Sequence, residues 1–273
     1  MTKKVKMQQR EDAYVFEYPE AIAFADAQNS IFWPPTEIKV EKDIQDIRVN
    51  NTEAETHAIV TILRLFTLYE RFAGKDYWGG RVMRMFPRPC IQTMANCFSF
   101  FEINVHARFY NALNEALNLN TPEFYLSYVE DETLKARMDF IDSAISDPDD
   151  LLSLAVFSAV EGCVLYAPFA FLKSFQVNGK NQMTNVVAGV DFSLRDENLH
   201  SEGGSWLFKQ LLKERKEAGL LSVQGVKNLE MAIIRAFNQI REHEFRIIDM
   251  MFEKGKIDGI TDVQLKHLSL IHI

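Results

Sequence analysis

The chain has 273 residues, of which 47% are hydrophobic and 12% aromatic, so it can bury a large core and is not a disordered protein. Its formal net charge of −8 argues against a nucleic-acid partner, because neutralising phosphates needs clustered Lys and Arg. Three cysteines without CxxC spacing indicate reduced thiols, and no run of about 18 uncharged apolar residues indicates a membrane span. These totals predict a soluble protein of the cytoplasm.

In chain order, residues 1–19 are expected to be extended, and apolar side chains at helical spacing then predict a helix over 20–32, stopped by Pro34 and Pro35. Thr52 is the predicted N-cap of a long helix that ends at Gly74, and a loop with "YWGG" and "FPRPC" follows. Further helices are predicted over 91–119, within 120–147, and over 147–175, 182–216 and 222–254. Few segments alternate with period two, so the expected fold is all-α, a helical bundle in a single domain of residues 1–273.

Four of the predicted helices carry an acidic residue among apolar neighbours, and two of them also place a histidine on the same face. A buried carboxylate costs on the order of several kcal/mol unless it is paired or bound to a cation, so four in one core need a common explanation. A shared metal site supplies it. In chain order the residues are Glu70, Glu102 with His106, Glu161, and Glu197 with His200.

The same order of residues occurs twice along the chain. The interval from the lone Glu to the His is 36 residues in the first half and 39 in the second. Such a repeat suits a bundle in which each of two helix pairs supplies half of a dinuclear centre, as in the ferritin-like di-iron and di-manganese carboxylate proteins. Carboxylate oxygens with one imidazole per metal favour iron or manganese over copper or structural zinc. The prediction is therefore a ferritin-like helical bundle with a dinuclear metal site in its core.

Other histidines do not share this pattern. Glu53 and His57 also have helical spacing, but they lie in a polar first turn and are expected to form an ordinary surface pair. His243, His267 and His272 have no matching acidic partner and are expected to be incidental. Taken alone, Glu70 also fits a solvated residue, so it is the joint pattern that favours metal binding.

Around these ligands the residues resemble those of the radical-generating small subunit of class I ribonucleotide reductase, over roughly residues 20–267. "IFWPPTEI" resembles the family's tryptophan motif, "HARFY" its histidine and radical tyrosine, "EGCVLYAPFAF" its lone-glutamate helix and "RDENLH" its second Glu and His motif. The resemblance implies that a pair of iron ions, or a manganese or mixed pair, activates dioxygen and generates a stable tyrosyl radical. A separate large subunit uses that radical to reduce ribonucleotides to deoxyribonucleotides. A homodimer is also implied.

Position by position, the resemblance implies a role for each residue. One metal would be bound by Glu70, Glu102 and His106, and the other by Glu161, Glu197 and His200. Tyr110 would carry the radical, although alone it reads as an ordinary core tyrosine. Trp33 and Asp196 would hand the electron hole toward the surface, with Asp196 hydrogen bonded between Trp33 and a ligand histidine.

Two ligand positions depart from the family pattern. The family usually has aspartate where this chain has Glu70, and its first paired motif is Glu-x-x-His rather than Glu-x-x-x-His. At about 100° per residue, a spacing of three places the His about 60° to one side of the Glu, and a spacing of four about 40° to the other. If Glu102 and His106 bind the same ion, the extra residue is predicted to be absorbed as a π-bulge between about 101 and 107.

Family members continue past the equivalent of "DVQLKH" with further helix and a flexible tail that docks on the large subunit, so a C-terminal truncation is expected. Our hypothesis is that "LSLIHI", residues 268–273, is not native. The codons CTG TCT CTT ATA CAC ATC, which form the end of a widely used sequencing transposon, translate to this peptide. Any other codons in the gene would refute the hypothesis.

Two other functions remain open for such a bundle. One is a ferritin-like di-iron oxidase, hydroxylase or desaturase that acts directly on an organic substrate, and the other is iron storage. Tyr110, Trp33 and Asp196 together favour the reductase subunit, whereas a ligand-sized apolar channel to the metals would favour the oxidase. Storage needs a cage-forming bundle with open iron entry, which the "WPP" segment does not suggest.

Overall fold

The computed structural model describes residues 4–177 and 179–272, and within this part the chain forms helices and connections without a β-strand. The α-helices are α1 (Pro19–Ser30), α2 (Glu53–Arg71), α3 (Met83–Met85), α4 (Pro89–Phe100), α5 (Ala107–Ala116), α6 (Pro122–Leu126), α7 (Glu132–Ser146), α8 (Asp150–Ala159), α9 (Tyr166–Lys173), α10 (Thr184–Glu217), α11 (Val223–Met251) and α12 (Asp262–His272). The 3₁₀ segments are η1 (Lys6–Gln8), η2 (Pro35–Glu37), η3 (Val40–Asp43), η7 (Ser127–Glu130) and η9 (Ser174–Gln176). The π-helical segments are η4 (Asp46–Asn50), η5 (Phe72–Val82), η6 (Phe101–His106) and η8 (Val160–Val164). The predicted all-α class is confirmed.

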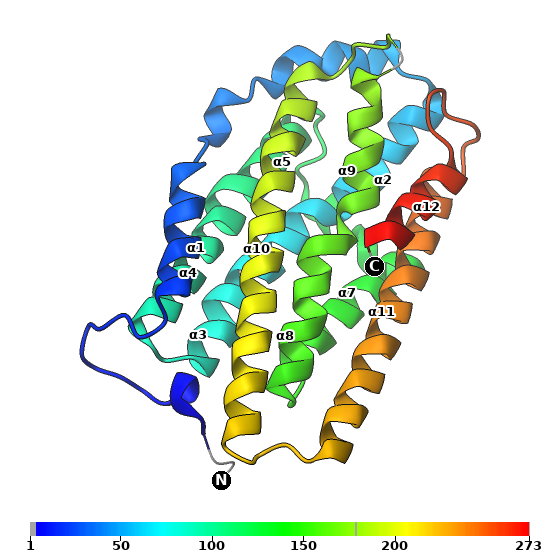
Figure 1. The fold of residues 1–273 in the computed structure, drawn as a ribbon. Helices are drawn as coiled ribbons and strands as arrows, with labels where there is room; N and C mark the ends of the chain where they lie inside the picture. Colours follow the sequence, from blue (N-terminus) through cyan, green and yellow to red (C-terminus); the bar gives the residue numbers. More distant parts are fainter. Residues whose placement is uncertain (1–3, 178, 273) are drawn as a thin grey trace.

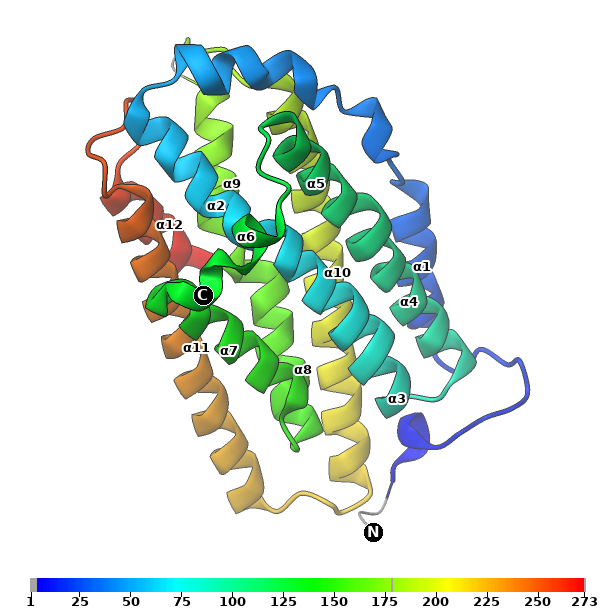
Figure 2. The same cartoon turned by 180° about the vertical axis from the view of Figure 1, so that it is seen from behind.

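The long helices lie side by side as a bundle (Figure 1). α10 runs through the middle of this view and packs against α8, α9 and α1. Figure 2 shows the opposite face, across which α2 runs, and α2 packs against α5 and α11. Buried apolar side chains from all of these helices form one connected cluster, so the helices share a common core.

The ends of the ligand-bearing helices are fixed by side-chain caps. Thr52 and Glu55 form the capping box of α2, which confirms Thr52 as its N-cap. At the start of α10, Asp46 accepts a hydrogen bond from the backbone N–H of Met183 at 2.8 Å, and Asp43 accepts one from Val186 at 2.6 Å. Carboxylates are favourable at a helix N-terminus, so the segment before α2 also fixes where α10 begins.

Gly74 does not end the second predicted helix. The chain continues without a break through η5 and α3 to Met85, so the predicted loop containing "YWGG" is wrong. A Cβ atom at Gly74 would lie 2.6 Å from Ile103 Cγ1 and 2.7 Å from Glu102 Cβ. Glycine is therefore required here because it lets this helix approach η6 closely, and not because a helix stops.

The apolar segment Asp150–Gln176 is long and hydrophobic enough to span a membrane, but 78% of its most apolar 18-residue stretch is buried inside the bundle. It comprises α8, η8, α9 and η9, and its start is capped by Asp149, whose side chain accepts from the N–H of Leu151. This segment is therefore a core helix of the bundle, and Glu161 interrupts its apolar surface.

Helix α12 was not among the predicted helices. It packs against α9 and α11 and buries Leu265 and Ser269. The hexapeptide 268–273 continues this helix as far as His272, and residue 273 lies outside the described residues. The codons of the gene remain the test of the hypothesis about these six residues.

A buried ion pair joins α7 to α11. The Arg137 guanidinium donates to Glu244 Oε1 at 2.5 Å, and each side chain is 1% exposed. An isolated charge at this depth is strongly unfavourable, so each of the two residues depends on the other.

Replacing Glu244 with alanine is expected to lower the free energy of unfolding by about 3–5 kcal/mol, because it leaves the buried Arg137 unpaired. Urea unfolding followed by circular dichroism measures the change. The control is Asp139→Ala on α7, the helix of Arg137. It removes the exposed ion-pair partner of Lys135 and should change the free energy of unfolding little. Equal losses in the two variants would contradict a structural role for the buried pair.

Candidate metal centre

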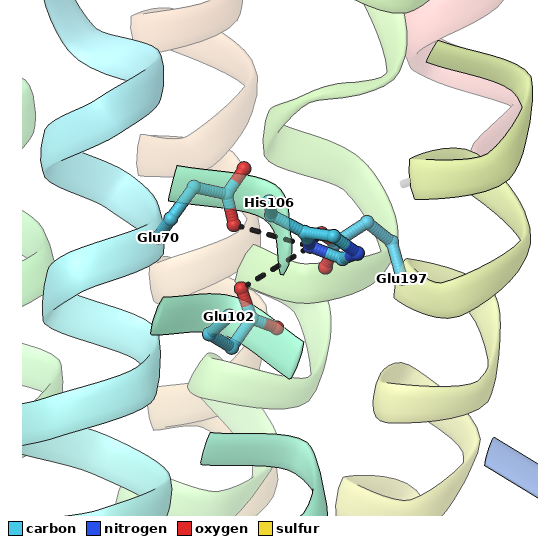
Figure 3. A group of neighbouring side chains, drawn as sticks. All are labelled: Glu70, Glu102, His106 and Glu197. Atoms are coloured by element: carbon cyan, nitrogen blue, oxygen red, sulfur yellow. Dashed lines mark ion pairs between the residues drawn. The ribbon is translucent and has the colours of Figure 1, made fainter. Parts of the chain in front are cut away.

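Six acidic and histidine side chains from four helical segments meet in the core, and each is at most 5% exposed. They are Glu70 on α2, Glu102 and His106 on η6, Glu161 on η8, and Glu197 and His200 on α10. In Figure 3, Glu70 and Glu197 approach His106 from opposite sides, and Glu102 lies below it. The structure thus brings all six predicted ligands together.

The side chains form two groups, within each of which the donor atoms lie within 4.8 Å of one another. The first is Glu70, Glu102, His106 and Glu197, and the second is Glu102, Glu161, Glu197 and His200. Glu102 and Glu197 belong to both groups, whereas the resemblance gave each of them to one metal.

The two carboxyl oxygens of each shared residue face different histidines. For Glu102, Oε2 lies 3.5 Å from His106 Nδ1 and Oε1 lies 2.5 Å from His200 Nδ1. For Glu197, Oε1 lies 3.0 Å from His106 Nδ1 and Oε2 lies 3.7 Å from His200 Nδ1. Both carboxylates therefore span the space between the two imidazoles, which is the arrangement expected of ligands shared by two ions.

The donor atoms fit a pair of divalent cations. Although they lie close together, none of the following atoms makes a hydrogen bond: Glu70 Oε1, both oxygens of Glu102 and of Glu197, and Nδ1 of His106 and His200. Buried polar atoms normally have a hydrogen-bond partner, so a cluster of them without one needs another explanation. Carboxylate and imidazole lone pairs that converge on the same space are what iron and manganese bind.

The electrostatics of the cluster agree with cation binding. Burial raises the pKa of Glu70 and Glu161 well above the usual range, and the charge of Glu102 raises both further. Burial also acts to raise the pKa of Glu102, but the positive charge of His200 and the close side chains of Glu70 and His106 outweigh it, so the pKa is lowered. Carboxylates packed this closely thus oppose one another's ionisation, and a cation bound among them would remove that opposition.

Three of the four segments that carry ligands are π-helical at or beside them. η6 contains both Glu102 and His106, which confirms the predicted π-bulge. η8 contains Glu161, and η5 starts two residues after Glu70. In α10, where the pair has Glu-x-x-His spacing, the helix is regular. The wider π turn therefore compensates for the extra residue between Glu102 and His106.

Tyr110 lies one helical turn beyond His106 and is 1% exposed. Its ring packs edge-on against Phe66, with centroids 4.7 Å apart, and against Phe109 at 4.8 Å. Burial raises the pKa of the phenol well above its usual range, and the negative charge of Glu70 adds to this effect. The hydroxyl therefore keeps its proton at neutral pH. Among the described residues it makes no hydrogen bond of normal geometry, and the neighbouring Ser193 hydroxyl acts to lower its pKa.

Asp196 connects the first metal group to a buried tryptophan. Its Oδ2 accepts a hydrogen bond from Trp33 Nε1 at 2.7 Å and lies 3.0 Å from His106 Nε2. The structure thus places Asp196 between Trp33 and a histidine of the cluster, as the resemblance implied. Gln28 donates to the other oxygen, Oδ1, at 3.0 Å. A single glutamine in α1 gives no sequence signal of this contact.

Trp78 is a second residue at the centre that the sequence did not reveal. Its Nε1 donates to Glu161 Oε1 at 2.7 Å, and the indole is fully buried. The sequence predicts a helix end at Gly74 and therefore a loop at "YWGG", which gives no reason to expect Trp78 in the core.

The histidines set aside lie outside the cluster where the structure describes them. Glu53 is exposed, and His57 Nε2 lies 2.9 Å from the carbonyl oxygen of Met250. His243 is half-buried against Phe140, and His267 is exposed. The side chain of His272 lies outside the described residues.

Residues 10–268 match the sequence profile of the family described as "Ribonucleotide reductase, small chain". The chain belongs to this family. It is therefore the small-subunit component of an oxidoreductase that reduces ribonucleotides, in which a dimetal centre activates dioxygen and generates a tyrosyl radical.

Similar proteins span viruses and bacteria. A probable ribonucleoside-diphosphate reductase small subunit of Invertebrate iridescent virus 6 is 27% identical over 266 residues, which cover 90% of this chain and 71% of that protein. Among solved structures, the ribonucleotide reductase R2 subunit of Clostridium botulinum has a TM-score of 0.75 at 20% identity, covering 93% of this chain and 78% of that one. Dimanganese(II)-NrdF of Streptococcus sanguinis has a TM-score of 0.76 at 17% identity, covering 90% and 84%. These structures share the fold.

Replacing Gly74 with alanine is expected to weaken metal binding about tenfold or more, because the new Cβ would lie 2.7 Å from Glu102 Cβ and displace that ligand. Titration of the metal-free protein with Mn²⁺ measures the affinity. Gly225→Ala is the matched control, since its Cβ would meet only the Ser222 hydroxyl, at 3.3 Å. Wild-type affinity in Gly74→Ala would show that the close helix contact does not position Glu102.

Proposed function

We propose that the six clustered side chains bind two metal ions, with Glu102 and Glu197 shared, and that Tyr110 stores the radical. The chemistry that a bound metal pair supplies is one-electron oxidation with dioxygen as the oxidant. The observation that supports Tyr110 is its position: a buried phenol lies one helical turn beyond His106.

The residues around Tyr110 suit a stored radical. Because the pKa of the phenol is raised, the hydroxyl is protonated, and oxidation to the neutral radical must remove both an electron and the phenolic proton. Phe66 and Phe109 pack on the ring and exclude water and reductants from it. The side chain is therefore uncharged before and after this step, because the electron and the proton both leave and are taken up by dioxygen as it is reduced. The rings around the phenol keep the site dry.

The chain from His106 through Asp196 to Trp33 is the proposed route toward the large subunit. Asp196 holds the two rings in a fixed arrangement, with His106 and Trp33 roughly parallel and their centroids 6.0 Å apart. Trp33 itself is buried, but the preceding residue, Phe32, is 51% exposed. A hole on Trp33 would thus lie one residue from the surface.

The metal is proposed to be a di-iron pair. Carboxylate and imidazole donors suit iron and manganese alike, and the Streptococcus sanguinis relative is named as a dimanganese protein. Elemental analysis of the protein as isolated distinguishes iron, manganese and mixed loading. We further propose a homodimer that pairs with a large subunit, and a cytoplasmic location, in keeping with the free thiols of Cys90 and Cys97.

The cavities favour radical generation over direct oxidation of an organic substrate. Glu70 and Glu161 line a cavity of about 10 Å³, which has room for roughly one water molecule. A cavity of about 1050 Å³ lies between α9, α10 and α12, but none of the six clustered side chains lines it. The first of these spaces is too small for an organic substrate.

Loading the protein with Fe²⁺ and exposing it to air is expected to give a tyrosyl radical, seen by electron paramagnetic resonance. Tyr110→Phe should abolish the signal, because the oxidisable phenol is lost, and should leave metal binding unchanged. Tyr125→Phe is the control, since that tyrosine hydrogen bonds Asn111 on α5 away from the cluster. Metal oxidation without a radical in the wild-type protein would support the alternative oxidase.

Trp33→Phe tests the proposed route. It removes the indole that donates to Asp196, so ribonucleotide reduction with the large subunit, assayed with the docking tail present, should fall at least 100-fold while the tyrosyl radical still forms. Assaying turnover and radical content on the same sample separates the two effects. Unchanged turnover would exclude Trp33 from the route.

A further inference from the structure

The two metal groups are supported from outside in opposite ways. In the first, the histidine is held, because Asp196 contacts His106 Nε2, whereas Glu70 Oε1 has no hydrogen-bond partner. In the second, the carboxylate is held, because Trp78 donates to Glu161 Oε1, whereas His200 Nε2 has no partner. Each group thus has one ligand whose orientation is fixed by a hydrogen bond from outside the cluster.

The Trp78 indole cannot easily turn away from Glu161. It packs edge-on against Phe98 at 4.9 Å and against Tyr77 at 5.0 Å, and Tyr77 in turn stacks on Phe157 at 3.6 Å. The next residue, Gly79, lies so close to α4 that a Cβ would be 2.8 Å from the Ser99 hydroxyl. Helices α4 and α8 therefore fix the direction of the N–H bond.

We propose that Trp78 is a positioning residue for Glu161, and that it selectively strengthens binding of the metal ion in the second group. With Oε1 accepting from a rigid donor, the plane of the carboxylate and the direction of its other oxygen are fixed before the metal arrives. The inference rests on the proposed function, because it takes the six clustered side chains as metal ligands. Hydrogen-bond partners of metal ligands typically change metal affinity by about 10- to 100-fold.

The test is a titration of the metal-free protein with Mn²⁺, in which the electron paramagnetic resonance signal of the free aqueous ion reports binding. Wild-type protein should bind two ions. Trp78→Phe should bind one ion with unchanged affinity and the other about 10- to 100-fold more weakly. Trp206→Phe, the matched control, removes an indole that packs on Tyr18 and Phe24, and should behave as wild type.

A double-mutant cycle shows whether Trp78 acts through Glu161. In a Glu161→Ala background, Trp78→Phe should cause no further loss of affinity, because the residue it orients is gone. A further loss of the same size, or wild-type affinity for both ions in Trp78→Phe, would overturn the inference. If wild-type protein does not bind two ions, the proposed metal centre itself is wrong, so the two failures are distinguishable.

If Trp78→Phe does not fold, the inference can be tested by nuclear magnetic resonance on protein that retains Trp78. In protein labelled with ¹⁵N in its tryptophan indoles, titration with diamagnetic Zn²⁺ should shift the Trp78 N–H signal as the second group fills. The same signal should lose its metal response in Glu161→Ala. If the chemical shift of the Trp78 N–H does not change on addition of Zn²⁺ to the wild-type protein, the positioning role is refuted.

Discussion

Four carboxylates are buried in the apolar core of the bundle, and much of the fold serves to hold them there. Glu70, Glu102, Glu161 and Glu197 come from four separate helical segments, yet their donor atoms and those of two histidines lie within 4.8 Å of one another in each group. Repulsion among them disfavours this arrangement, and two cations would remove the repulsion. Until metal binds, the bundle must therefore hold the carboxylates through helix packing, contacts with His106 and His200, and the hydrogen bond from Trp78 to Glu161. Its irregular features contribute to that packing.

Two kinds of irregularity bring the ligands together. The π segments change the direction of side chains along a helix, so that Glu102 and His106 face one point although four residues separate them. Gly74 allows the helix that carries Glu70 to approach η6 at a distance that no other residue permits. Both features cost backbone stability compared with a regular α-helix of better helix-forming residues, and both occur beside ligands.

The sequence was sufficient to identify the six side chains that cluster in the core, but not their surroundings. Glu161 could be identified because a carboxylate among Val160, Cys163 and Val164 is anomalous on local grounds, and the π-bulge followed from counting residues between Glu102 and His106. By contrast, the residues around Gly74 look the same whether this glycine ends a helix or permits a close helix contact. The contact that decides between the two is with Ile103, about thirty residues further along the chain. The membership of Glu102 and Glu197 in both groups likewise depends on the distance between η6 and α10. The spacing of residues along one helix does not determine that distance.

Trp33 and Trp78 make the same interaction, an indole N–H donated to a buried carboxylate at 2.7 Å, and yet the structure supports different roles for them. Trp33 donates to Asp196, which also contacts His106, so the bond forms part of a continuous chain that ends beside the exposed Phe32. Trp78 donates to Glu161 itself and is enclosed by Tyr77, Phe98 and other buried rings. Asp196 lies outside the six clustered side chains and links one of them to Trp33, whereas Glu161 is itself one of the six, so the Trp78 bond acts directly on a proposed ligand.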